Sequence, residues 1–448
     1  MWPPFFSAPT EALILVGRYR KRRRRLEVWQ GVAAASGLRV VESPSLRARP
    51  QVLKALAGPV EVRFEDSRRY GTRVVVVVPG PPGFSDVTIH REPGQPSGPP
   101  VEVGDVLFDR AFYVLGPVPL VCAMLDAEVR GLLWRLSAEC RLEIAGGELR
   151  AEMRETHVAS LLPLLLDLGQ RLAQHVDPPR CLAENARRDP DAGARLRNLL
   201  VLAREFPGAA ETVEALRTAC SDPKPEIRLR AAQGLGAEGR DALLELAQSE
   251  LDDTWNAQAV SILGRRLPFD LTSGILTHAL RRRRTLTARA CLESLGRSGD
   301  PAAVATLANV MAREQGELAT AAALALGKAG STAAEPPLIL ALQQKNTDVM
   351  AAAATALGQV GTAEAVLPLK KATERTSFHP ALHRAIRQAI AEIQFRLPGA
   401  SPGQLSLAAA EAGQLSLAPA EAGQLSLATD PAGQLSLPSG EADRVCGE

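Results

Sequence analysis

Clustered arginines are the side chains of this 448-residue chain with the clearest capacity for binding. Four stand together at Arg281–Arg284, and two more, Arg265 and Arg266, stand one predicted helix earlier. Guanidinium groups bind carboxylates through paired hydrogen bonds, and aromatic side chains add energy at protein interfaces. The alternative is a solvated cluster that complements the dipole at a helix end. We predict a protein-binding site formed by Trp255, Arg265, Arg266, Arg281, Arg282, Arg283 and Arg284.

No pattern predicts catalysis or a metal site. His379 and His383 are four residues apart, but Pro380 between them starts a helix and leaves His379 outside it. No Gly-X-Ser-X-Gly, Walker or Gly-X-Gly-X-X-Gly motif stands in a suitable context. We therefore expect no enzymatic activity, no cofactor and no metal. The cysteines form no Cys-X-X-Cys pair, so we interpret them as reduced thiols of a cytoplasmic protein, at positions 122, 140, 181, 220, 291 and 446.

The arginines belong to a helical pattern that repeats along the chain. Alanine-rich runs end in Leu-Gly, and the leucines at 235, 263, 295, 326 and 357 are 28, 32, 31 and 31 residues apart. Such a period predicts a solenoid of stacked helix pairs, stable only as an array. We expect each glycine to stop the first helix of its pair in a left-handed conformation. Asp222, Asp253 and Asp348 are the predicted caps of new units.

The Ala-Ala-X-X-Leu-Gly runs resemble the short HEAT repeats of the phycobilisome-lyase type, over about residues 194–397. The resemblance implies a surface for protein partners, and as an alternative a bilin-lyase-like enzyme. A tetrapyrrole groove needs aromatic side chains, and the array has few: Phe206, Trp255, Phe269, Phe378 and Phe395.

Two other classes of protein with HEAT-like repeats can be compared with this sequence. HEAT-like DNA glycosylases imply a nucleic-acid-binding alternative, but the later repeats lack cations like those at Arg281–Arg284, apart from four lysines. The resemblance to deoxyhypusine hydroxylases would require His-Glu pairs, and none of the six histidines precedes a glutamate. We therefore expect a protein partner rather than nucleic acid.

Four regions follow from the composition. Residues 1–25 are an apolar and then basic segment, 26–178 an α+β domain, 190–397 the all-α HEAT-type solenoid, and 398–448 a disordered acidic tail. In the α+β domain the predicted strands are 38–42, 60–64, 73–78, 86–90 and 108–115, the hairpin is 141–154, and the helices are 120–136 and 156–175.

The sequences at both ends of the chain allow more than one interpretation. Residues 1–17 are too short and too interrupted by proline for a full membrane helix, so a truncated anchor competes with a disordered start followed by a solvated basic run at Arg18–Arg25. In the tail, Gly-Gln-Leu-Ser-Leu recurs at Gly403, Gly413, Gly423 and Gly433. These copies resemble the bacterial sliding-clamp peptide without its aromatic residue; the other interpretations are a different docking motif or an inert linker.

Together these features predict a bacterial scaffold or adaptor without enzymatic activity. The net charge of +2 argues against a general nucleic-acid or membrane-surface role for the whole chain. The predicted location is cytoplasmic, with a tether to the cytoplasmic face of the inner membrane if residues 1–17 are an anchor. The second helix of each pair is expected to face the partner.

Overall fold

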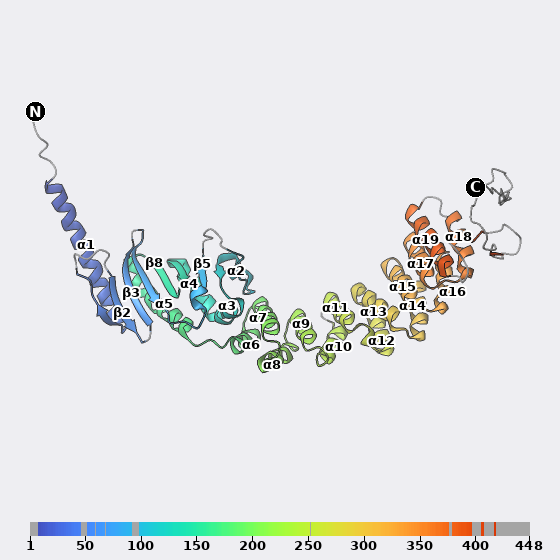
Figure 1. Cartoon of the computed structure of the whole chain (residues 1–448), viewed down its shortest axis with the longest axis horizontal. Coiled ribbons are helices and arrows are strands. Elements are labelled where there is room, and N and C mark those ends of the chain that lie inside the picture. Colours follow the sequence, from blue (N-terminus) through green and yellow to red (C-terminus); the bar gives the residue numbers. More distant parts are fainter. Residues whose placement is uncertain are drawn as a thin grey trace, which may run out of the picture. The chain divides into compact units, whose positions relative to one another are not determined.

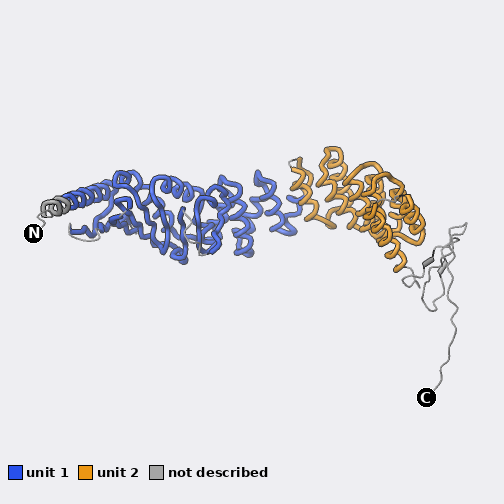
Figure 2. Tube along the Cα trace, turned by 90° about the horizontal axis from the view of Figure 1, so that it is seen from above, with its two compact units in different colours: residues 1–243 blue, residues 244–448 orange. Residues whose placement is uncertain are grey.

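The computed structural model describes residues 8–45, 52–58, 60–67, 69–91, 98–250, 252–375, 379–396, 405–406 and 416–417. The chain divides into two compact units, Met1–Leu243 and Leu244–Glu448, shown in different colours in Figure 2. An α+β domain precedes the helix pairs, as predicted. The predicted limits of the four regions stay predictions, and the tail lies outside the described residues except for two short strands, β9 (Leu405–Ser406) and β10 (Ser416–Leu417).

An eight-stranded sheet forms the first part of unit 1, in the order β1-β2-β3-β4-β8-β7-β5-β6 (Figure 1). Every neighbouring pair is antiparallel. Alternate residues are buried, as in β3, where Val60, Val62 and Phe64 lie in the core. The strands are β1 (Arg39–Glu42), β2 (Val52–Ala57), β3 (Val60–Ser67), β4 (Gly71–Val77), β5 (Thr88–His90), β6 (Tyr113–Leu115), β7 (Arg141–Ala145) and β8 (Glu148–Met153).

Helices α1 (Ala8–Ala35) and α5 (Val158–Ala173) pack against this sheet. Trp29 on α1 is fully buried, its ring centroid lies 6.1 Å from that of Phe64, and its indole N–H donates to Thr72 Oγ1 at 3.2 Å. The leucines of α5 face the same core. The remaining helices of the α+β domain are α2 (Val106–Ala111), α3 (Val118–Met124) and α4 (Ala127–Glu139), with 3-10 turns at Phe84–Asp86 and Glu155–His157.

Two predicted elements of this domain are wrong. Residues 108–115 do not form one strand, because Asp105 accepts hydrogen bonds from the Leu107 and Phe108 amides and starts α2 there. Residues 120–136 are two helices rather than one, because Asp126 starts α4 by accepting from the Val129 amide at 2.8 Å. Strand β2 was not predicted, whereas the hairpin of β7 and β8 is confirmed.

The basic run is helical and only partly solvated. Arg25 is 8 % exposed and forms ion pairs with Asp66 and Glu155, which tie α1 to the sheet and to the start of α5. The interpretation of Arg18–Arg25 as wholly solvated is therefore wrong at its last residue. Within the described part of the chain, none of the helices has the length and apolar character needed to cross a bilayer.

Helices continue from α6 to the end of unit 1. A buried cluster links them to the α+β domain: Arg130 on α4 makes two hydrogen bonds of 2.9 Å to Asp189, and its Nε donates to Asp105 at 3.1 Å. Both Arg130 and Asp189 are nearly inaccessible to solvent. The helices are α6 (Pro178–Arg188), α7 (Ala192–Glu205), α8 (Ala210–Ala219), α9 (Pro225–Gly234) and α10 (Arg240–Gln248), which crosses into unit 2.

In unit 2 the odd-numbered helices pack one upon the next, from α11 to α19, and the even-numbered helices form a second layer (Figure 1). Three 3-10 turns, at Gly264–Arg266, Thr332–Ala334 and Ala363–Ala365, connect helices. The helices are α11 (Asp253–Leu263), α12 (Phe269–Arg281), α13 (Thr285–Ser298), α14 (Pro301–Arg313), α15 (Glu317–Lys328), α16 (Glu335–Ala341), α17 (Thr347–Val360), α18 (Val366–Arg375) and α19 (Pro380–Arg396).

The repeated Leu-Gly glycines have two different roles. Gly236 and Gly264 follow the last residues of α9 and α11 with positive φ of 60° and 47°, but the ψ of −131° at Gly264 lies outside the left-handed helical region that was predicted. Gly296, Gly327 and Gly358 instead lie inside helices, so the predicted stop is wrong for them. A Cβ at Gly296 would lie 2.6 Å from the Ala325 carbonyl oxygen and 2.9 Å from its Cα. These glycines are needed for the close approach of neighbouring odd-numbered helices.

None of the three predicted caps is the N-cap of its unit's first helix. Asp222 accepts from the amide of Lys224, the N-cap residue of α9, at 2.8 Å. Asp252 caps α11, and Asn346 rather than Asp348 caps α17. Asp253 reaches the next odd-numbered helix, where it accepts from the Leu286 and Thr287 amides, both at 2.9 Å, and from the Thr287 hydroxyl at 2.6 Å. Asp253 therefore caps α13 from the preceding repeat, and it links two neighbouring repeats of unit 2.

Candidate interaction surfaces

The predicted arginine cluster lies at the turn between α12 and α13. Arg281, Arg282 and Arg283 are exposed, and Arg283 has a φ of 55°. Arg284 is not available as a simple anchor, because its guanidinium donates to the carbonyl oxygens of Ser249 and Glu250, each at 2.6 Å. Arg282 lies 3.2 Å from the Glu250 carboxylate. Half of the cluster therefore holds the loop after α10, and only Arg281 and Arg283 point to solvent without a described carboxylate partner.

The structure separates the other predicted site residues. Arg265 and Arg266 are exposed in the turn before α12, whereas Arg281–Arg284 follow its last turn. A 13-residue helix is about 20 Å long, so the two groups of arginines cannot contact the same small feature of a partner. Trp255 is half-buried near the start of α11. Because Asp253 bonds to Leu286 and Thr287, Trp255 lies at the same end of the helices as Arg281–Arg284.

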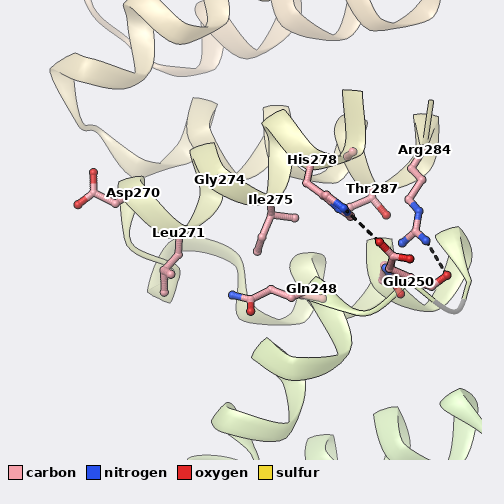
Figure 3. A pocket seen from close by; sticks show the side chains of 12 residues that line it. Gln248, Glu250, Asp270, Leu271, Gly274, Ile275, His278, Arg284 and Thr287 are labelled. Carbon is pink, nitrogen blue, oxygen red and sulfur yellow. Dashed lines mark hydrogen bonds and ion pairs between the residues drawn. The ribbon is translucent and has the colours of Figure 1, made fainter. Parts of the chain in front are cut away.

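A hollow of about 290 Å³ lies beside this cluster and is shown in Figure 3. Three of its charged or titratable side chains are engaged with the protein itself: His278 Nε2 is 3.6 Å from Glu250 Oε1, and Arg284 donates to the loop carbonyls. Asp270 lies near the other end of α12, away from both (Figure 3). The described residues of this hollow bring no nucleophile together with a base, so the arrangement is suited to holding a loop rather than to chemistry.

Two further hollows lie along the odd-numbered helices and meet at Arg289 and Glu293. Their volumes are about 290 Å³, across α11 and α13, and about 670 Å³, across α13, α15 and α17. On each helix the lining residues are three or four apart, so they form one face. We call this surface the alanine face; its residues include Thr254, Gln258, Ser261, Leu286, Arg289, Glu293, Glu317, Thr320, Leu324, Lys328, Asp348, Ala351 and Thr355.

The alanine face combines small side chains with a few larger apolar ones. Leu286 and Leu324 are 37 % and 38 % exposed, although both belong to well-packed helices. The charged side chains on this face are of both signs, unlike the rows of cations that a surface for nucleic-acid phosphates usually carries. Phe395, 81 % exposed, lines a separate hollow between α17 and α19. The prediction of a contact surface on the second helices stays a prediction; the alanine face was not among the predicted sites, although the spacing of 286, 289 and 293 indicates one helix face.

Burial raises the pKa of each of the five described cysteine thiols. Burial raises the pKa of the Cys122 thiol to about 11 and that of the Cys291 thiol to about 12. Both side chains are packed in the core, which agrees with their interpretation as small hydrophobic residues. The described residues contain no group of three or more His, Cys, Asp or Glu side chains with the geometry of a metal site.

Comparison with known proteins identifies the repeats. A family model described as HEAT repeats matches residues 312–391. The chain contains HEAT repeats. The matched segment runs from α14 to α19, which includes the tightly packed glycines Gly327 and Gly358. No curated protein matches the chain.

Among solved structures, one similar chain is human deoxyhypusine hydroxylase in complex with glycerol. It is 15 % identical with a TM-score of 0.22, covering 48 % of this chain and 96 % of that chain. Another is an engineered protein, 17 % identical with a TM-score of 0.24, covering 49 % of this chain and 90 % of that chain.

Proposed function

We propose that this chain is a non-enzymatic scaffold or adaptor that binds a protein partner through the alanine face of its HEAT repeats. HEAT repeats generally mediate protein interactions, and the observation that supports this surface is its continuity over four successive odd-numbered helices. A partner helix or loop laid along the face would meet a new set of contacts at each repeat. The close packing of glycines against alanines between neighbouring odd-numbered helices keeps the contact residues of successive repeats close together.

Leu286 and Leu324 would supply most of the contact energy. Each is only about one-third exposed, so its packed part fixes the rotamer before binding and little side-chain entropy is lost. Full burial of a leucine side chain from water is worth about 1.5–3 kcal/mol, so covering the remaining exposed third of each side chain would contribute about 0.5–1 kcal/mol. Arg289 lies between them on the same surface and is suited to a carboxylate of the partner. The exposed Arg281 and Arg283, together with Trp255, form a second contact region in the proposal.

A paired substitution tests the face. Leu324→Glu places a charge at the centre of the alanine face, whereas Leu340→Glu places the same charge on α16 of the other layer, where the side chain is 64 % exposed. Full-length protein carrying each substitution is used to purify partners from the native host. We expect Leu324→Glu to lower recovery of the partner about 10-fold or more and Leu340→Glu to leave it unchanged. Equal recovery with both variants would contradict the proposed surface.

The proposal also includes the predicted tether and the phycobilisome-lyase type of the repeats. Residues 1–17 would hold the protein at the cytoplasmic face of a membrane, with the basic run Arg18–Arg25 of α1 beside anionic lipid. Flotation of the full chain with vesicles that contain anionic lipid, compared with a chain lacking residues 1–17, tests the tether. Co-purification of a visible pigment would support the lyase alternative over the scaffold.

A further inference from the structure

A large groove in the α+β domain is the feature that the HEAT-repeat proposal does not use. Its volume is about 1150 Å³, and it lies where β4, β8, β7 and β5 end next to the last turn of α4. These four strands are neighbours in the sheet. The groove is polar, and arginine is the side chain that recurs along it.

Each of the four strands brings one arginine to the same end of the sheet. Arg69 stands two residues before β4, Arg154 directly after β8, Arg141 at the start of β7, and Arg91 directly after β5. The antiparallel register aligns these ends, because Thr72 pairs with Met153, Arg141 with Glu152, and His90 with Glu143. Neighbouring strands are about 4.8 Å apart, so the row of arginines is about 15 Å long.

The charge of the groove is positive and largely uncompensated. All four arginine side chains are exposed, and no described carboxylate lies within ion-pair distance of any of them. Two of the three glutamates in the groove are already paired with arginines outside it: Glu152 lies 2.5 Å from Arg73, and Glu143 lies 3.8 Å from Arg150. Only Glu139 remains without such a partner among the described residues of the groove.

Two of the arginines are held in position by aromatic rings. The Arg69 guanidinium lies 5.4 Å from the centroid of the Tyr70 ring. The Arg91 guanidinium lies 5.5 Å from that of Trp134, and it donates to the Ser137 carbonyl oxygen at 2.8 Å. A guanidinium that is stacked and hydrogen-bonded loses little freedom when it binds an anion. The Arg91 end of the row is therefore pre-organised, and the Tyr70 ring restricts Arg69 at the other end.

We propose that this groove binds an acidic peptide in an extended conformation across the strand ends. An extended chain rises about 3.3 Å per residue, so about five residues match the row, and carboxylates on alternate residues would be about 6.6 Å apart on one side. Each would lie between two arginines of the row. Glu139, the carboxylate of the groove without a described arginine partner, would repel the evenly charged backbone of a nucleic acid, whereas an alternating peptide can place a neutral residue beside it.

The test measures fluorescence anisotropy of a fluorescein-labelled (Glu-Ala)4 peptide with the full chain. The Arg141→Gln/Arg154→Gln double variant removes two exposed side chains and should weaken binding about 10-fold or more. The matched control is Arg187→Gln/Arg188→Gln on α6, which makes the same change of net charge at side chains that are 51 % and 72 % exposed. It should change the affinity less than about 2-fold. Unchanged thermal unfolding by circular dichroism would show that both variants are folded.

Three results would overturn the proposal. The first is equal binding of (Glu-Ala)4 by the wild type and the Arg141→Gln/Arg154→Gln variant. The second is equal binding of a (Gln-Ala)4 peptide, because the site is expected to depend on carboxylates. The third is tighter, arginine-dependent binding of a twelve-residue oligothymidine, which would assign the row to single-stranded nucleic acid instead. The proposal is supported only if the acidic peptide binds and the groove variant alone weakens it.

Discussion

Substitution of Gly296 by alanine should destabilise unit 2, although alanine is the better helix former. Gly296 lies inside α13, and a Cβ there would be 2.6 Å from the Ala325 carbonyl oxygen and 3.0 Å from the Ala325 Cβ. The contacting atoms are mostly backbone, so α13 and α15 would have to move apart. Overpacking of this kind costs about 1–3 kcal/mol, and the gain in helix propensity is about 1 kcal/mol. A net loss of about 1 kcal/mol in the free energy of unfolding is therefore expected.

A second glycine gives the matched control. Gly274 lies inside α12 and has no atom within 4 Å of its ideal Cβ position, so Gly274→Ala should stabilise the protein by about 0.5–1 kcal/mol. Urea unfolding of the full-length variants, followed by circular dichroism at 222 nm, measures both. The midpoint for Gly296→Ala should fall by about 0.5 M, whereas that for Gly274→Ala should rise. If Gly296→Ala is as stabilising as Gly274→Ala, the close packing of the odd-numbered helices is refuted.

Three further predictions concern buried polar groups and thiols. Asp253→Ala should lower the free energy of unfolding by about 1–2 kcal/mol. Partial burial opposes ionisation of Asp253, but the hydrogen bonds that it accepts from Thr287 and Leu286 lower its pKa. Its stabilising contribution is therefore present above the unfolded-state pKa and is lost as the pH falls through the folded-state pKa, which urea midpoints at pH 7 and pH 3 would show. Arg130→Ala should cost about 3–5 kcal/mol because it leaves the Asp189 carboxylate buried and unpaired, whereas the exposed Arg187→Ala should cost less than about 0.5 kcal/mol in the same assay. Cys291 should react with a thiol reagent at pH 8 only after unfolding, since its pKa is raised to about 12 by burial; fast labelling in the native protein would contradict its place in the core.

The repeated pattern was sufficient to predict the helix pairs because it combines period, composition and helix stops. The Leu-Gly spacing located α11, α13, α15 and α17, and Pro301 marked the first turn of α14. What the spacing could not distinguish was the reason for each glycine. A glycine that ends a helix and a glycine that lets another helix approach look the same in one sequence, because the second reason depends on a residue about 30 positions away.

The candidate sites depend on contacts between residues that are far apart in the sequence, and local patterns could not predict those contacts. A run of four arginines is visible in the sequence, but the carbonyl oxygens of Ser249 and Glu250, which occupy Arg284, are not. In the α+β domain the arginines of the groove are spread from position 69 to position 154 and meet only through the strand order β4-β8-β7-β5. That order depends on long-range pairing, which local patterns do not contain.

The most direct test of the proposed scaffold uses a photo-crosslinking amino acid in the native host. The residue p-benzoylphenylalanine is placed at Leu286, at Leu324 or, as a control on the other layer, at Leu340 of the full-length chain. We predict that the first two positions crosslink to one and the same protein and that Leu340 does not. Crosslinking to that protein from Leu340 alone, or to unrelated proteins from Leu286 and Leu324, would contradict a continuous partner-binding face on the odd-numbered helices.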